Sequence, residues 1–259
     1  MTATSTAPRI LLIGSDHPTT WIVYNRLIRE FGLFSAIIEE PVSRRQLVRN
    51  RARRLGWGAA LSQVAFVTLL RPILQYQASR RIRAICREHA METQQPLTPA
   101  IEHVGNINSP EAIALIAGKK PDVVIVNGTR ILKKDLLDSV RATFINTHQG
   151  ITPMYRGAHG GYWALYNNDP ANCGVTIHLV DEGIDTGHII AQALISPAAI
   201  DTYMSYPYLQ VAAALPLLAM AIRTISAGTL MTTIRNGPST IWHHPGFFQY
   251  LRARLRGVK

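Results

Sequence analysis

The strongest constraint on the fold is a series of short apolar runs separated by stretches of helical periodicity. Arg9–Gly14 and Phe34–Ile38 are two such runs, and Trp21–Phe31 between them has a helical pattern that closes at Gly32. Pro121–Val126 is rich in Val and Ile without polar alternation, which is typical of a strand buried on both faces of a parallel sheet. The chain is therefore predicted to be an α/β protein with a Rossmann-like, doubly wound, mainly parallel sheet.

Two later strand patterns carry polar residues at their ends. Thr143–Thr147 leads to Asn146 and His148, which are two residues apart and therefore leave the same face of a strand. Gly174–Val180 runs into an acidic, glycine-containing turn that includes Asp185. Sheets of this class bind ligands beyond the carboxyl ends of their strands. An amide, an imidazole and a carboxylate at such ends predict a functional site.

Three motifs occur in one order: Asn146-Thr147-His148, then Pro153-Met154-Tyr155-Arg156-Gly157, then Asp181-Glu182-Gly183-Ile184-Asp185-Thr186-Gly187. Together with Pro121–Leu132 upstream, this order resembles the folate-dependent formyltransferase family. That family comprises formyl-tetrahydrofolate N-formyltransferases acting on amino sugars, on phosphoribosylglycinamide or, through an N-terminal domain, on methionyl-tRNA. The resemblance covers roughly residues 100–195, and Gln149–Thr152 departs from the family pattern.

The resemblance implies that Asn146, His148 and Asp185 are the catalytic residues, and their chemistry suits acyl transfer to an amine. Such a reaction passes through a tetrahedral carbon with a developing oxyanion. The amide of Asn146 can donate to that oxygen, and a protonated His148 can add a charged donor. Asp185 would raise the pKa of His148 by proximity and take the proton of the amine, directly or through a water molecule.

The resemblance also assigns binding loops. It implies that formyl-tetrahydrofolate lies against Asn127, Gly128, Thr129, Arg130, Ile131, Leu132, Asp181, Glu182 and Gly183. The acceptor would lie against the loop after the first strand, and against the second motif, through Ser15, Asp16, His17, Tyr155, Arg156 and Gly157. A plain helix cap at Ser15–His17 remains an equal alternative.

Other side chains receive no catalytic assignment. Gly14 alone does not make a dinucleotide-binding loop. His178 alternates with Thr176 and Val180 and is interpreted as structural, while His159 and His188 stay unassigned. Cys and His residues lack metal-ligand spacing, so no metal is expected.

Positive charge is concentrated in one segment. Eleven of the 27 Lys and Arg residues lie between Pro41 and Arg87, where no acidic residue occurs, and the net charge is +11. The segment is predicted to be a basic helical insert over residues 41–90. Its arginines, in residues 44–87, could cover helices packed on the sheet, hold an interfacial helix on anionic lipid, or contact phosphates of a nucleotide or nucleic acid. The apolar run Trp57–Leu70 is shorter than the ~20 residues of a membrane span.

The domain prediction is a catalytic domain over residues 1–195 and a helical C-terminal extension over 196–259. About 60 residues are too few for the C-terminal barrel of the methionyl-tRNA enzymes, so a nucleic-acid partner is not favoured. Within the extension, Tyr208–Ile225 is helical, with a kink or new start expected at Pro216. Cys86 and Cys173 are not expected to pair, and Met1–Pro8 has no export signal. A cytoplasmic protein, with a possible position at the inner membrane surface, is expected.

The favoured interpretation is a formyl-tetrahydrofolate-dependent N-formyltransferase whose acceptor is the amine of a small phosphorylated molecule, first a nucleotide-linked amino sugar. Phosphoribosylglycinamide and methionyl-tRNA are the alternative acceptors. A catalytically silent module that binds folate or nucleotide is the alternative of another class. The oligomeric state is left open.

Overall fold

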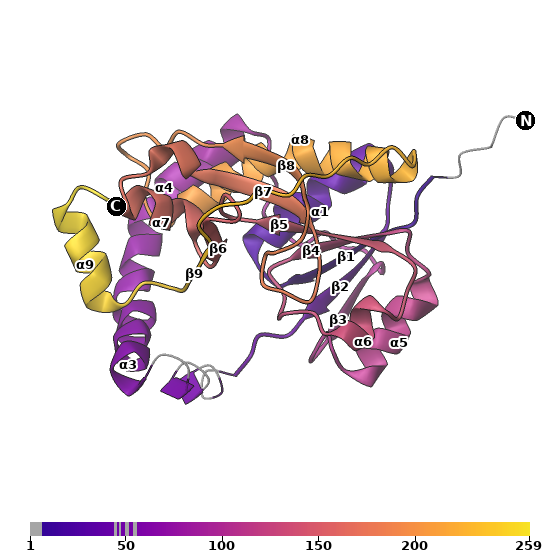
Figure 1. The fold of residues 1–259 in the computed structure, drawn as a ribbon, viewed down its shortest axis with the longest axis horizontal. Helices are drawn as coiled ribbons and strands as arrows, with labels where there is room; N and C mark the ends of the chain where they lie inside the picture. Colours follow the sequence, from indigo (N-terminus) through magenta and orange to yellow (C-terminus); the bar gives the residue numbers. More distant parts are fainter. Residues whose placement is uncertain (1–6, 44–45, 47, 50–51, 54–55) are drawn as a thin grey trace, which may run out of the picture.

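The computed structural model describes residues 7–43, 46, 48–49, 52–53 and 56–259. Its centre is a seven-stranded sheet in the order β3-β2-β1-β4-β5-β7-β8 (Figure 1). Five neighbouring strands, β3 to β5 in that order, are parallel, and β7 is antiparallel to both β5 and β8. The strand bounds are β1 Ile10–Ser15, β2 Ser35–Glu39, β3 Ile101–Val104, β4 Val123–Asn127, β5 Thr143–His148, β7 Gly174–Leu179 and β8 Ile189–Leu194. The predicted mainly parallel α/β sheet is confirmed.

Helices cover both faces of the sheet. Along β1, Ile10 and Leu12 belong to one buried cluster, while Leu11 and Ile13 belong to another. The first cluster includes residues of α1 (Pro18–Phe31), α4 (Arg71–Glu88) and α8 (Tyr206–Ser226). The second includes residues of α5 (Pro110–Lys119) and α6 (Lys134–Leu137). Because both faces are buried, the central strands need no polar alternation.

One long helix dominates the insert. α3 (Trp57–Ala65), the π-helical segment η1 (Phe66–Leu70) and α4 run on without a break from Trp57 to Glu88, over 32 residues. The apolar run Trp57–Leu70, which is shorter than a membrane span by itself, is therefore the first part of a longer helix. The π-type hydrogen bond from Arg71 N to Phe66 O directly precedes Pro72, whose nitrogen has no hydrogen to donate. Residues 44, 45, 47, 50, 51, 54 and 55 of the insert lie outside the described residues.

Two of the described helices, Trp57–Glu88 and α8, are long and apolar enough to cross a membrane by length and composition. The two differ in what the fold buries. Over the most apolar 18 residues of each helix, the buried share is 44% in α8 but only 17% in the long helix. The apolar character of α8 is thus largely explained by its place in the core, and α8 continues through Pro216, where an interruption was expected.

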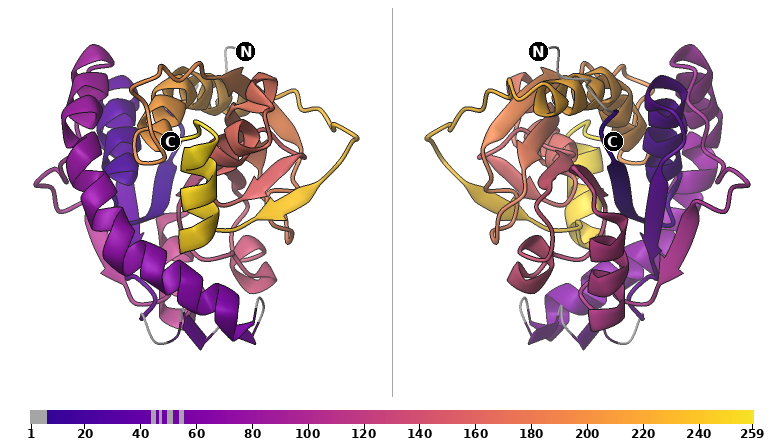
Figure 2. Two further views of the ribbon diagram at one scale, coloured as in Figure 1. Left: turned by 90° about the vertical axis from the view of Figure 1, so that its left-hand side faces the viewer. Right: turned by 90° about the vertical axis from the view of Figure 1, so that its right-hand side faces the viewer.

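The C-terminal segment forms a second, two-stranded sheet with an earlier part of the chain. β9 (Thr240–Trp242) pairs in parallel with β6 (Tyr155–Gly157), and this strand is absent from the sequence prediction. Between β6 and β7 lie α7 (Gly160–Tyr166) and the short 3₁₀ helix η2 (Pro170–Asn172). The chain ends with α9 (Phe247–Leu255), which lies beside α3 in both views of Figure 2. Phe247 N donates to Ser62 Oγ at 3.0 Å and fixes this contact.

Candidate active site

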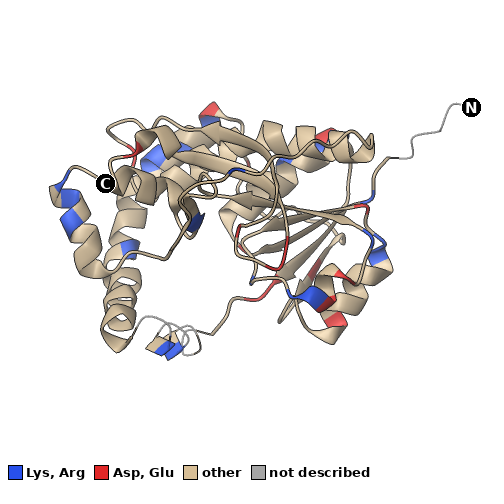
Figure 3. Cartoon of the chain, in the orientation of Figure 1, with Lys and Arg blue, Asp and Glu red and all other residues tan. Residues whose placement is uncertain are grey.

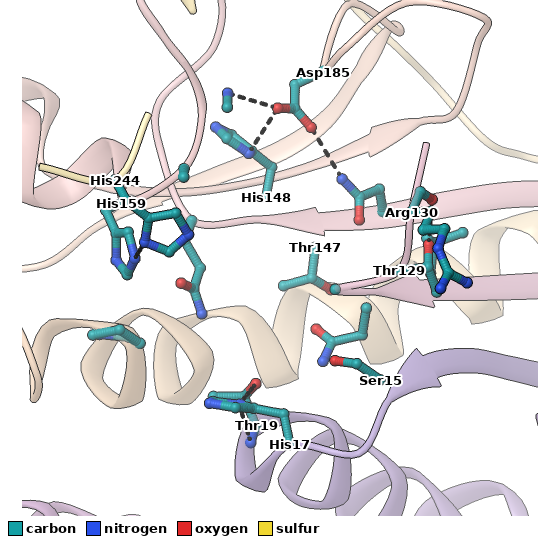
Figure 4. A pocket seen from close by; sticks show the side chains of 18 of the residues that line it. Ser15, His17, Thr19, Thr129, Arg130, Thr147, His148, His159, Asp185 and His244 are labelled. Carbon is teal, nitrogen blue, oxygen red and sulfur yellow. Dashed lines mark hydrogen bonds and ion pairs between the residues drawn. The ribbon is translucent and has the colours of Figure 1, made fainter. Parts of the chain in front are cut away.

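A polar cluster forms where β5 and β7 meet the loop after β7 (Figure 4). Asn146 and His148 leave the same face near the end of β5, and Asp185 reaches both of them from the loop. Asp185 Oδ1 accepts from Asn146 Nδ2 at 3.2 Å, and Asp185 Oδ2 lies 3.2 Å from His148 Nδ1. The three residues that the sequence motifs single out as catalytic are therefore in direct contact.

The loop holds Asp185 in a left-handed conformation, with φ of 51°. Asp181 Oδ1 organises this loop by accepting from Gly183 N at 3.0 Å and from Thr186 Oγ1 at 2.6 Å. A Cβ at Gly183 would lie 1.9 Å from Thr186 Oγ1, so the turn requires glycine at this position. From the other side, Gly157 N donates to Asp185 Oδ2 at 2.8 Å. The carboxylate is thus held at a defined position.

His178 is a fourth member of this polar cluster. It faces Asn146 across the β5–β7 pair, and its Nε2 lies 3.1 Å from Asn146 Nδ2 and 3.5 Å from Asp185 Oδ1. His178 Nδ1 donates to Leu179 O at 2.7 Å, which leaves Nε2 to accept from the Asn146 amide. The interpretation of His178 as structural did not include this contact and stays a prediction. Its alternation with Thr176 and Val180 was the signal, since it places the imidazole on a defined face of β7.

Opposing effects set the charges in this cluster. Burial alone would raise the pKa of Asp185, but its neighbours, above all His148 and also Gly157 N–H, lower that pKa to about 2. Burial lowers the pKa of His148, whereas Asp185 and the carbonyl of Tyr155 oppose that change. His148 Nε2 donates to Tyr155 O at 2.6 Å, so both ring nitrogens face acceptors. Asp185 is therefore an anion at neutral pH, and it is the group that favours a proton on His148.

A cavity of about 1000 Å³ opens over the carboxyl ends of β1, β4 and β5. The catalytic candidates line it together with most of the predicted binding residues. Those lining residues are Ser15, His17, Asn127, Gly128, Thr129, Arg130, Ile131, Leu132, Asn146, His148, Gly157, Asp181, Gly183 and Asp185. The loops after β4 and β7 thus meet at one cavity.

Two of the predicted binding residues lie outside this wall because their side chains serve the scaffold. Asp16 Oδ1 accepts from Trp21 Nε1 at 2.9 Å, which ties the turn after β1 to α1. Glu182 is exposed and lies 3.5 Å from the Nζ atom of Lys134.

Tyr155 and Arg156 also lie outside the cavity wall. Tyr155 is buried, and its hydroxyl donates to Asp169 Oδ2 at 2.9 Å. Arg156 Nε donates to Ile184 O at 2.7 Å, next to Asp185 in the chain, and its Nη1 donates to Ser239 Oγ at 2.8 Å. Arg156 therefore holds the loop next to Asp185, while Tyr155 ties β6 to Asp169.

Arg130 lines the cavity, but its guanidinium is engaged in the scaffold. Its Nη1 forms an ion pair with the buried Glu39 at the end of β2 and donates to Gly105 O at 3.0 Å. Glu39 also accepts from Arg130 N at 2.9 Å and from Ile107 N at 2.8 Å. These bonds tie the ends of β2, β3 and β4 together, so Arg130 shapes the loop that lines the cavity.

A second group of lining residues comes from segments far apart in the chain. Tyr203 Oη lies 2.7 Å from His159 Nε2, and His159 Nε2 lies 3.1 Å from His244 Nδ1. His17 caps α1 through its Nδ1, and Arg71 belongs to the long helix. We call His17, Arg71, His159, Tyr203 and His244 the basic lobe of the cavity. The sequence motifs point to His17 alone among these five as a binding residue.

Arg71 is the permanently charged member of the basic lobe. Burial, followed by His244, Arg71 and His17, lowers the pKa of His159 well below its ordinary value. Burial and Arg71 likewise lower the pKa of His17. The acidic residues described in the cavity wall are Asp181 and Asp185, which are committed to the loop and to the polar cluster. Within the described ranges, no three His, Cys, Asp or Glu side chains form a group suited to a metal ion.

Solved structures of formyltransferases are similar to this chain in fold. A solved sugar N-formyltransferase from Shewanella sp FDAARGOS_354 is similar in fold, with a TM-score of 0.57, 15% identity, and coverage of 92% of this chain and 77% of that chain. Glycinamide ribonucleotide transformylase 1 from Symbiobacterium toebii has a TM-score of 0.56 and 20% identity, covering 91% of this chain and 94% of that one. These likenesses concern the fold.

Sequence similarity to curated relatives covers part of the chain. The methionyl-tRNA formyltransferase of Chlorobium chlorochromatii is 32% identical over 112 residues, which are 40% of this chain and 35% of that protein. The chain thus matches about a third of the length of such curated relatives. The sequence model of the family described as Formyl transferase matches residues 78–207, half of the chain, including the polar cluster. The chain belongs to the formyl transferase family.

Proposed function

We propose that the protein transfers a formyl group from formyl-tetrahydrofolate to the primary amine of a small phosphorylated molecule, first a nucleotide-linked amino sugar. The observation that carries the proposal is the contact between Asn146, His148 and Asp185 at the wall of a cavity. The reaction breaks the bond between the formyl carbon and the folate nitrogen and forms one to the acceptor nitrogen. One proton leaves the amine and ends on the folate nitrogen.

The donor side of the cavity fits a flat, partly polar ring system. Ile131, Leu132, Val180 and Ile184 offer apolar walls, and the backbone from Asn127 to Thr129 offers polar groups between them. Because Arg130 is bound to Glu39, this loop keeps its shape without a ligand. When bound there, formyl-tetrahydrofolate supplies the activated formyl group, and these residues hold its ring.

The polar cluster supplies the groups that acyl transfer needs. Both N–H groups of the Asn146 amide are occupied, one by His178 and the other by Asp185. An acceptor amine that donates to Asp185 Oδ1 replaces the second bond and frees that N–H for the formyl oxygen. Asn146 then donates to the developing oxyanion.

Asp185 is suited to relay the proton of the amine. With a pKa of about 2, it is a weak base that stabilises positive charge on the attacking nitrogen and passes the proton on. His148 keeps the carboxylate in place, because Asp185 Oδ2 bonds to His148 on one side and to Gly157 N on the other.

The basic lobe supports an anionic acceptor. Arg71 is exposed, and no ion pair is described for it among residues 7–43 and 56–259. Together with the donors His17, His159, Tyr203 and His244, it suits a phosphate group beside the amine. His17, Arg71 and His244 lie outside the segment that the family model matches, and His159 and Tyr203 lie within it.

The test is a screen of acceptors with formyl-tetrahydrofolate and the full chain, measured by release of tetrahydrofolate. The panel holds nucleotide-linked amino sugars, glycinamide ribonucleotide and methionyl-tRNA. We expect turnover with an amino sugar and a loss of about 10²–10³-fold in kcat for Asn146→Ala. The matched control Asn236→Ala removes an exposed amide and leaves turnover unchanged. Turnover with methionyl-tRNA alone contradicts the acceptor class, and binding of folate without any turnover identifies a catalytically silent module.

A further inference from the structure

The long helix Trp57–Glu88 presents a face that the fold leaves uncovered. Leu69, Ile73 and Tyr76 are 63%, 54% and 83% exposed, and their spacing of four and three residues places them on one side of the helix. Trp57 and Leu61, one turn apart, are also exposed. We call these five residues the apolar stripe.

The same side of the helix becomes basic further along. Arg80 follows Tyr76 by four residues, Arg83 follows Arg80 by three, and Arg87 follows Arg83 by four. These steps keep the three arginines on the side of Ile73 and Tyr76, and all three are exposed. None of the three has an ion pair with any residue that the structure describes, whereas Arg81 on the inner side pairs with Asp201. An apolar half and an arginine half therefore follow one another along one face.

α9 extends this surface. Phe248, Leu251 and Leu255 are exposed at spacings of three and four residues, and Arg252 and Arg254 lie among them. Gln63 Nε2 donates to His244 O at 2.7 Å, which anchors the segment before α9 to α3. Figure 2 shows α9 beside the long helix, and Figure 3 shows basic residues and no acidic residue on α9.

We propose that this surface docks the protein in the plane of a membrane leaflet that contains anionic phospholipids. Apolar side chains with an aromatic residue at each end, Trp57 and Tyr76, suit the boundary between headgroups and acyl chains. Arginines without acidic partners attract lipid phosphates, and the two signals together give stable binding where one alone does not.

The helix lies on the membrane and does not cross it, because its other face belongs to the core. Ala60, Phe66, Leu74 and Ile82 are buried against the protein. A crossing helix would have to withdraw these side chains from their contacts and place Arg71, within the apolar ~20 residues from Trp57, in lipid. A position in the interface keeps every contact of the fold and covers the face that the fold exposes.

Vesicle co-sedimentation of the full chain tests the proposal. The vesicles consist of phosphatidylcholine alone or with phosphatidylglycerol as the minor component, at low salt and at near-physiological salt. We expect binding to the anionic vesicles that weakens as salt rises. Equal binding to both compositions, or none to either, overturns the proposal.

Two variants separate the contributions. Arg80→Gln/Arg83→Gln/Arg87→Gln should weaken binding roughly 100-fold at low salt, since each arginine near the surface contributes about fivefold. Leu69→Ser/Ile73→Ser should weaken it about tenfold or more. The matched controls are Lys120→Gln/Lys133→Gln/Arg141→Gln and Leu97→Ser/Ile234→Ser, which remove equally exposed groups elsewhere.

Sedimentation equilibrium supplies the competing outcome. If the apolar stripe is covered by a second copy of the chain, the protein is a dimer that Leu69→Ser/Ile73→Ser converts to monomer, and the membrane proposal is wrong. A monomer whose vesicle binding is lost in both test variants and kept in both controls supports it. Thermal melting of each variant verifies that the fold is retained.

Discussion

The polar cluster is a closed set of hydrogen bonds in which each member limits the others. His178 fixes one N–H of the Asn146 amide, and Asp185 takes the other. His148 has an acceptor on each ring nitrogen. Within this cluster, Asp185 is the group that can exchange a partner for a substrate without leaving a buried polar atom unpaired. Its Oδ1 can release Asn146 because its Oδ2 keeps the contacts with His148 and Gly157 N.

Asp185→Asn tests this dependence. The amide keeps the shape but loses the charge that favours a proton on His148 and receives the proton of the amine. We expect kcat/KM to fall about 10²–10⁴-fold, measured with the acceptor found in the screen. Asp135→Asn, on the exposed side of α6, is the control. If kcat/KM falls by less than about threefold, Asp185 does not act as the proton relay.

His159 makes the protein sensitive to acid. Its pKa lies well below 6.5 in the folded state, so the unfolded chain binds a proton at a higher pH than the folded chain does. The free energy of unfolding therefore falls as pH drops below about 6.5, by up to about 1.4 kcal/mol per pH unit for this histidine. We expect His159→Gln to flatten the dependence of Tm on pH between pH 6.5 and 5. An unchanged slope in a variant that still folds contradicts the assignment.

At the scale of elements, β6 and β9 connect the C-terminal segment to the site. Gly157 has φ of 86°, and a Cβ on it would lie 2.3 Å from Trp242 O. Gly157→Ala should therefore separate β6 from β9 and displace the N–H that holds Asp185. We expect a loss of about 3 kcal/mol in the free energy of unfolding and a large loss of activity, measured by urea unfolding and by formyl transfer.

Gly228→Ala is the matched control for this change. Gly228 has φ of 67°, but a Cβ added to it would meet no atom within 4 Å, and it is far from the site in sequence. The substitution should cost about 1 kcal/mol and leave activity intact. Equal costs for the two variants would mean that the β6–β9 contact contributes nothing.

The elements differ in how far local pattern predicts them. β1 and β4 are recognisable because burial on both faces leaves a continuous apolar run. β9 is three residues long and largely exposed, and it exists because β6 offers a partner 83 or more residues earlier in the chain, which no local pattern records. The motifs locate Asn146, His148 and Asp185, whereas Arg71, Tyr203 and His244 join the cavity only through the packing of distant segments.

At the scale of the whole molecule, one ion pair fastens the insert to the C-terminal half. Arg81 donates through Nε at 2.8 Å to Asp201, whose side chain is almost fully buried and also accepts from Ser205 Oγ at 3.0 Å. Arg81→Ala leaves this carboxylate without its cation, and we expect the free energy of unfolding to fall by about 2 kcal/mol in urea titrations. Arg83→Ala, two residues along and exposed, should change it by less than about 0.5 kcal/mol.

The long helix lines the cavity with one face and exposes the opposite face along the same turns. Val67, Arg71 and Gln75 line the cavity, while Leu69, Ile73 and Tyr76, about half a turn away, face outward. A ligand on one face and a lipid surface on the other therefore act on one rigid body, and thermodynamic linkage makes their effects reciprocal. If a ligand in the basic lobe changes the affinity for lipid by some factor, lipid changes the affinity for that ligand by the same factor. Measuring the acceptor affinity with and without anionic vesicles would therefore show whether the two faces of this helix are coupled.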